Sequence, residues 1–237
     1  AVAATNLFHQ GNWQRVYAAK NDSILKKSLI VSFVSIIPIV FFMGFSGLVA
    51  VSDNPKVNPD LAFFSLIIKN QKELWSMIII VLALSLTIST VDTLVNAISS
   101  LVVVDGKEII KFNNTNDYFL ISKYFLIIIS TVVFIVASNG FSILYLFLLA
   151  DLFCCAAVLT VFYGFYNKHI NEKTAYLSII TGLIVGLLLF PLPDFSKSLL
   201  VGVIFPIDIF PKFVSQSLLL LSFLTSTFIP MTIWKLR

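Results

Sequence analysis

The sequence is short of the residues on which soluble proteins and enzymes depend. Only 12% of its 237 residues are charged, and it contains two cysteines and two histidines. A soluble domain carries about 25% charged residues, so this shortage excludes a soluble globular domain. The two cysteines are the adjacent Cys154 and Cys155, a spacing that excludes both a structural disulfide and a zinc site. We expect both to pack as small apolar side chains.

Enzyme motifs are also missing. The sequence has no phosphate-binding glycine loop, no HExxH and no nucleophile elbow. His9 and His169 are far apart in the sequence and give no support to a catalytic triad or a metal cluster. We therefore expect a protein that is not an enzyme and holds no cofactor. The net charge of +4 is explained by the loop bias described below, so no nucleic-acid partner is expected.

Long apolar runs dominate the chain, of which 58% is hydrophobic. A hydrocarbon core of roughly 30 Å needs about 20 helical residues to cross it. The runs are continuous and lack the alternation of a membrane barrel, which favours helices. The sequence predicts an all-α integral membrane protein whose partner is the lipid bilayer, with six spans at about 28–51, 76–104, 118–136, 141–166, 174–192 and 213–234.

The positive charges predict an orientation. Eleven of the sixteen Lys and Arg residues lie at the two chain ends or follow the second and fourth spans, and five lie in the alternate loops. By the positive-inside rule both termini are then cytoplasmic, as an even number of spans requires.

A polar stripe interrupts the second span. Ser85, Ser89, Asp92, Asn96 and Ser99 recur at spacings of three and four and so share one helix face. Such a face binds an ion or solute, or it packs against a neighbouring helix. Asp92 favours the first interpretation, because a carboxylate at mid-depth costs roughly 2.5–3.5 kcal/mol on insertion scales. Asp151 in the fourth span has two equal interpretations, a transport-pathway acid or a structural partner for Ser or Asn on a neighbouring helix.

Three segments resemble the sodium/solute symporter family, and most closely its urea-transporter-like branch. GNWQRVYAAKN, from Gly11, resembles the segment that leaves the sixth core helix; LTISTVDTLVNAISSLVVVD, from Leu86, resembles the eighth core helix; EKTAYLSIITGLIVG, from Glu172, resembles the entry of a later helix. Together they cover nearly the full length of the chain. The resemblance implies a plasma-membrane protein that couples sodium flow to uptake of a small polar solute such as urea or a polyamine.

The family has the leucine-transporter fold, in which two inverted repeats enclose a site at the membrane midplane. The resemblance implies that residues 1–237 form a partial symporter domain. Residues 1–20 would be the tail of the sixth core helix, followed by the rest of the second repeat and two accessory helices. The first repeat would be supplied by a missing N-terminal half or a partner chain. The alternative function is a truncated, non-transporting membrane protein or a helix-bundle subunit.

The resemblance also implies site residues. The carbonyl of Leu86 and the hydroxyls of Ser89 and Thr90 would form half of a sodium site, since hard cations prefer oxygen ligands. Asp92 would serve a second cation, a proton or the solute, so proton coupling stays open beside sodium coupling. His9 resembles a family position within the gate helix, which implies a role in solute access. In the transporter hypothesis Asp151 would take the pathway role, the first of its two interpretations.

Three other features have mainly structural interpretations. Residues 61–68 form an apolar patch that resembles the family's outer-loop helix or is an interfacial helix. The GxxxG at Gly182 and Gly186 predicts close helix packing, either within the chain, which is favoured, or between two chains in a dimer. Residues 191–211, with four prolines, predict a surface or re-entrant connection and not a seventh span.

Overall fold

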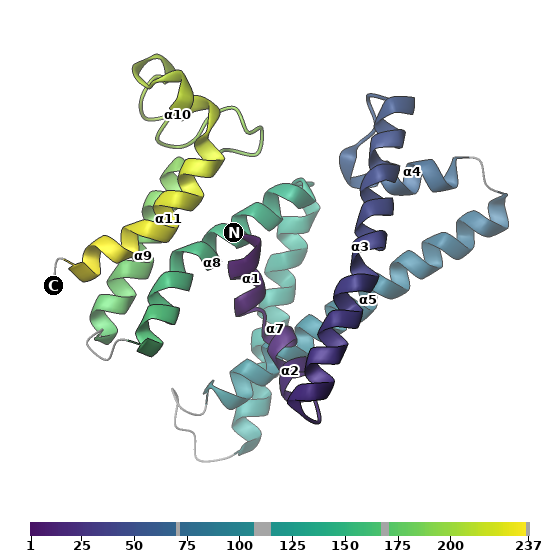
Figure 1. Cartoon of the computed structure of the whole chain (residues 1–237), viewed down its shortest axis with the longest axis horizontal. Helices are drawn as coiled ribbons and strands as arrows, with labels where there is room; N and C mark the ends of the chain where they lie inside the picture. The colour runs from purple at the N-terminus through teal and green to yellow at the C-terminus, as the bar shows by residue number, and fades with distance from the viewer. Residues whose placement is uncertain (70–71, 107–114, 167–170, 236–237) are drawn as a thin grey trace. The chain divides into compact units, whose positions relative to one another are not determined.

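The computed structural model describes residues 1–69, 72–106, 115–166 and 171–235, and Figure 1 shows its elements. In these ranges all regular secondary structure is helical apart from three isolated β-bridges. Some residues of the sequence analysis lie outside the described residues. They are four cations that carry the charge bias, Lys107, Lys111, Lys168 and Arg237, and one histidine, His169.

Five helices in these ranges are long and apolar enough to cross a membrane, and they indicate an integral membrane protein. They match the first five expected spans and extend several of them by a few residues. Their bounds are α3 (Asp22–Asp53), α5 (Glu73–Val104), α7 (Thr115–Ser138), α8 (Ile143–Tyr166) and α9 (Glu172–Leu189).

The sixth expected span differs from its prediction. It was expected to run as one helix from Phe213. Instead, Phe213 lies in a separate short helix, α10 (Lys212–Gln216), and α11 covers Leu218–Lys235. The two helices are interrupted at Ser217, whose backbone leaves the helical conformation. The apolar part of α11, Leu218–Ile233, is consequently shorter than the other five helices.

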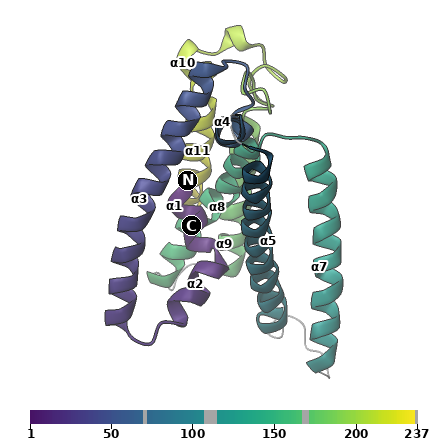
Figure 2. The same cartoon turned by 90° about the vertical axis from the view of Figure 1, so that its right-hand side faces the viewer.

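The chain divides into two compact units, which we describe separately. Unit 2, residues 10–140, contains α2 (Gln10–Tyr17), α3, η1 (Pro59–Leu61), α4 (Ala62–Ile68), α5 and α7. The side chain of Asn21 caps α3 by accepting a hydrogen bond from the backbone N–H of Ile24 at 2.9 Å. Both Figure 1 and Figure 2 show α4 beside the C-terminal end of α3.

Unit 1 joins residues 1–9 to residues 141–237. Its centre is the packing of α8, α9 and α11, and α1 (Val2–Phe8) lies against α8. Buried residues, most of them small or polar, recur every four positions on all three central helices. They are Leu152, Ala156 and Thr160 on α8; Thr174, Ser178, Gly182 and Gly186 on α9; and Leu218, Ser222, Ser226 and Pro230 on α11.

The two glycines of the GxxxG motif lie at the closest approach of these helices. A Cβ atom added at Gly182 would lie 2.8 Å from the carbonyl oxygen of Ser226, and one at Gly186 would lie 2.8 Å from the Cβ of Ser226. The Ser226 hydroxyl also donates to the carbonyl of Leu152 at 3.4 Å. The expected packing within the chain is therefore confirmed.

Two connections depart from regular helix. The expected single helical tail over residues 1–20 is broken at His9, whose extended backbone separates α1 from α2. Residues 190–206 fold on themselves through the bridges Pro191–Ser198, Ser198–Gly202 and Val201–Phe205, with Ser198 and Val201 buried. This segment holds no span-length helix, as its prolines predicted.

Candidate functional site

The expected sodium ligands lie together on one turn of α5. The Thr90 hydroxyl donates to the Leu86 carbonyl at 2.9 Å, so these two oxygen atoms are neighbours on the same helix face. The side chains of Ser89 and Thr90 are exposed. The Thr90 oxygen keeps its lone pairs while donating, so it can face a cation. A single helix turn supplies too few ligands for a full shell, so the remaining oxygens would have to come from another element.

Asp92 lies one half-turn further along α5 and about 5 Å along the axis from the helix midpoint. Its side chain is exposed, and its only hydrogen-bond partner in the described residues is Asn96, whose Nδ2 donates to Oδ2 at a long 3.4 Å. A carboxylate at this depth needs a polar partner or a cation, because hydrocarbon does not solvate it.

The far end of the same stripe has a packing role. The hydroxyls of Ser99 on α5 and Ser122 on α7 lie 2.8 Å apart and share a hydrogen bond. The Gln14 amide on α2 donates to the Ser100 hydroxyl at 3.0 Å. Residues 99–100 therefore join helices. The segment from Leu86 to Asn96 has no such cross-helix hydrogen bond among the described residues. The packing interpretation thus applies to one end of the stripe, and the binding interpretation remains a prediction for the other.

Asp151 has a structural partner within unit 1. It is 7% exposed, and the Thr5 hydroxyl of α1 donates to its Oδ1. A partner on a neighbouring helix was expected, but from Ser or Asn; the observed partner is a threonine, and Thr5 itself was not singled out. Nothing in the pattern of residues 1–9 sets Thr5 apart, because the contact depends on how α1 packs on α8. A pathway role for Asp151 stays a prediction.

His9 terminates α1, close to the aromatic contact of Phe8 with Phe162 on α8, whose ring centroids are 6.4 Å apart. Its Nδ1 is buried and has no hydrogen-bond partner in the described part of the chain. The hydroxyl of Thr160 on α8 is also buried and also has no hydrogen-bond partner in the described part of the chain. A buried polar atom without a partner is costly, so His9 is a position at which a water or solute atom would be favourable.

The expected site residues thus fall into two groups. Leu86, Ser89, Thr90 and Asp92 all lie on α5 in unit 2, whereas Asp151 and His9 belong to unit 1. Within the described residues, no group of three or more His, Cys, Asp or Glu side chains converges as it would around a transition metal. Cys154 and Cys155 are free thiols, the second of them buried, as expected of packing residues.

Comparisons with models of known families, with curated proteins and with solved structures find no match to this chain. The class that composition and fold indicate is therefore an all-helical integral membrane protein.

Proposed function

We propose that the protein is a transporter that couples the movement of sodium to the uptake of a small polar solute, such as urea or a polyamine. One observation carries the proposal: α5 is a 32-residue apolar helix that exposes a hydroxyl–carbonyl pair and a carboxylate near its middle. Retaining these groups in hydrocarbon is costly unless they bind an ion or a solute.

The residues have distinct roles in this proposal. Leu86, Ser89 and Thr90 contribute part of a sodium shell, and Asp92 binds a second cation, a proton or the solute. Asp151 and His9 line a solute pathway. The proposed arrangement follows the resemblance to the sodium/solute symporter family, with two inverted repeats that rock around a midplane site in the plasma membrane and both termini in the cytoplasm.

The test uses the full-length gene product and measures solute uptake at a series of sodium concentrations. Ser89→Ala and Thr90→Ala are expected to raise the sodium concentration for half-maximal uptake, since each removes an oxygen ligand. Thr131→Ala is the matched control, because its exposed hydroxyl makes the same kind of bond, to the carbonyl of Ile127 at 2.8 Å, but lies on α7. Sodium dependence that is equal in all three variants would remove the site assignment.

The second candidate, a non-transporting subunit of a helix bundle, is favoured by the helix-joining contacts of Ser99 and Ser100. This candidate predicts that no substitution on α5 changes solute uptake. Substitutions at residues 99–100 would instead reduce the assembly of the helix bundle. Replacing sodium by protons in the same assay distinguishes proton from sodium coupling.

A further inference from the structure

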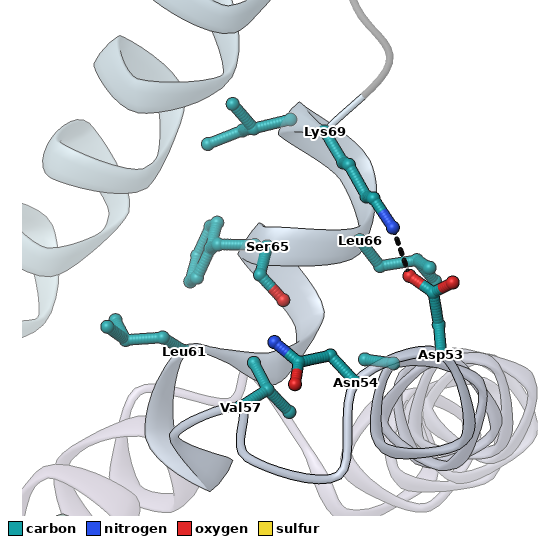
Figure 3. Close-up of a pocket in the computed structure, with 10 residues that line it drawn as sticks. Asp53, Asn54, Val57, Leu61, Ser65, Leu66 and Lys69 are labelled. Carbon is teal, nitrogen blue, oxygen red and sulfur yellow. Dashed lines mark hydrogen bonds and ion pairs between the residues drawn. The ribbon is translucent and has the colours of Figure 1, made fainter.

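A pocket of about 470 Å³ lies between the C-terminal end of α3 and the short helix α4, entirely within unit 2. Figure 3 shows the side chains that surround it. Most of its wall is apolar and comes from Val57, Leu61, Phe64, Leu66 and Ile68. A volume of this size is within the range of small-molecule sites in proteins.

The depth of the pocket in the membrane follows from α3. Because α3 is long and apolar enough to span, its charged end at Asp53 reaches the headgroup region. Helix α4 is held against this end by two small buried residues, Ala50 at 3% exposure and Ala62 at 5%. The pocket therefore opens at the level where lipid headgroups meet the acyl chains.

Polar groups gather on one side of the pocket. Lys69 at the end of α4 forms an ion pair with Oδ2 of Asp53, and the side chains of both are about half exposed. Asn54 follows Asp53, and its Oδ1 accepts from the backbone N–H of Lys56 at 3.1 Å. That bond orients the amide so that its nitrogen faces Ser65 inside the pocket (Figure 3).

These groups retain unused bonding capacity. The Lys69 ammonium has three donors, of which Asp53 uses one, and Asp53 has a second carboxylate oxygen. Donors for a phosphate, from Lys69 and Asn54, thus lie beside an acceptor for an ammonium, from Asp53. The Asp53 carboxylate would repel a purely anionic headgroup, and a purely apolar ligand would make no hydrogen bond to Asp53, Asn54 or Lys69.

From this juxtaposition we propose that the α3–α4 pocket binds a zwitterionic phospholipid, with phosphatidylethanolamine as the preferred headgroup. Its phosphate contacts Lys69 and the Asn54 amide, its ammonium donates to Asp53, and its glycerol and upper acyl carbons contact Leu61, Phe64 and Leu66. Ethanolamine is preferred to choline because a primary ammonium donates hydrogen bonds to a carboxylate and a quaternary one does not. This site is independent of the proposed transport function.

The experiment measures the phospholipids that remain on the purified full chain after incorporation into nanodiscs of phosphatidylcholine, phosphatidylethanolamine and phosphatidylglycerol in equal parts. Native mass spectrometry counts the bound lipid. The wild-type chain is expected to retain phosphatidylethanolamine above the other two. Asp53→Asn and Lys69→Gln each remove one charged partner and are expected to lower this retention by about three- to ten-fold.

Matched controls change the same charges outside the pocket lining. Asp60→Asn and Lys56→Gln are expected to retain the lipid as the wild type does, since neither side chain lines the pocket. Leu66→Trp fills the pocket without a change of charge and is expected to displace the lipid as well, which gives a test that does not depend on the ion pair. Equal retention in pocket and control variants, or a preference for phosphatidylglycerol, would overturn the proposal.

Discussion

In unit 1 most of the Ser, Thr and Asp side chains on the apolar helices are buried, whereas in unit 2 most of those on α5 are exposed. In α8, 28% of the most apolar 18-residue stretch is buried, and in α9 the share is 22%; for α3 and α5 it is 0%. Ser178, Ser222 and Ser226 have no exposed surface, but Ser89 and Asp92 are exposed.

The difference separates two uses of polar residues in a membrane helix. Where small and polar residues recur every four positions on three facing helices, they allow close approach of the backbones. On α5 the carboxylate and hydroxyls have hydrogen-bond partners only on their own helix. Inside a membrane they need a further partner, which must be another segment, an ion or a solute. The predictions below test this distinction, in order of decreasing expected effect.

The largest effect is expected from enlarging a glycine in the unit 1 packing. In Gly186→Val the new Cβ would lie 2.8 Å from the Cβ of Ser226 and 3.0 Å from Cδ1 of Leu152, so the helices must separate. We expect a loss of about 1–3 kcal/mol in the free energy of unfolding, measured by chemical denaturation in detergent micelles. Gly44→Val on α3 is the control, because no atom lies within 4 Å of its added Cβ. Equal losses would contradict the assignment of tight packing to unit 1.

Removal of the two mid-span carboxylates should have different consequences. Asp151→Ala removes the acceptor of the Thr5 hydroxyl inside unit 1, with an expected loss of about 1–2 kcal/mol in the free energy of unfolding. Asp151→Asn keeps an acceptor oxygen and should lose less. Asp92→Ala removes an exposed side chain and is expected to change stability by less than about 0.5 kcal/mol. A similar loss for Asp92→Ala would mean that Asp92 is a structural residue.

A double-mutant cycle of Ser99→Ala and Ser122→Ala measures the one part of the α5 stripe that joins helices. The hydroxyl pair, 2.8 Å apart, is expected to show a coupling of about 0.6 kcal/mol in the free energy of unfolding. The same cycle with Ser89→Ala in place of Ser99→Ala should show no coupling to Ser122. Coupling between Ser89 and Ser122 would indicate that the whole stripe packs against α7.

The smallest effect concerns a loop of unit 1. The Ser196 hydroxyl and backbone N–H donate to Asp194 and hold the pKa of that carboxyl below its ordinary value. A depressed pKa means that the interaction stabilises the fold above the ordinary pKa and is lost as the pH falls through the folded-state pKa. In Ser196→Ala the pKa of Asp194 is expected to rise toward its ordinary value, as followed by NMR titration of the carboxyl carbon. An unchanged pKa would exclude the hydroxyl as its cause.

Much of the helical architecture followed from the sequence. Runs of about 20 apolar residues have few alternatives to a spanning helix, so five of the expected spans are present with small changes at their ends. The break at Ser217 was not predicted, because residues 213–234 carry no proline or glycine before Pro230 that would mark an interruption. The break at His9 was also missed, because residues 1–10 carry no proline or glycine and Gly11 comes only after the break.

The candidate site was predictable only in part. The spacing of Leu86, Ser89 and Thr90 placed them on one turn, because helix geometry is local. Thr5 as the partner of Asp151, Ser122 as the partner of Ser99, and the α3–α4 pocket were not predictable, because each joins residues that are distant in the sequence or separated by a turn.

By itself the sequence determined the helical membrane class, the approximate spans and the faces on which polar residues lie, since these depend on hydropathy and on the period of the helix. Only the tertiary structure decided which polar faces are buried. Ser99 and Asp151 form hydrogen bonds with side chains on other helices, whereas Ser89 and Asp92 are exposed. The physical reason is that a hydrogen bond between helices depends on how distant segments pack, and the spacing of residues along one helix does not determine that packing.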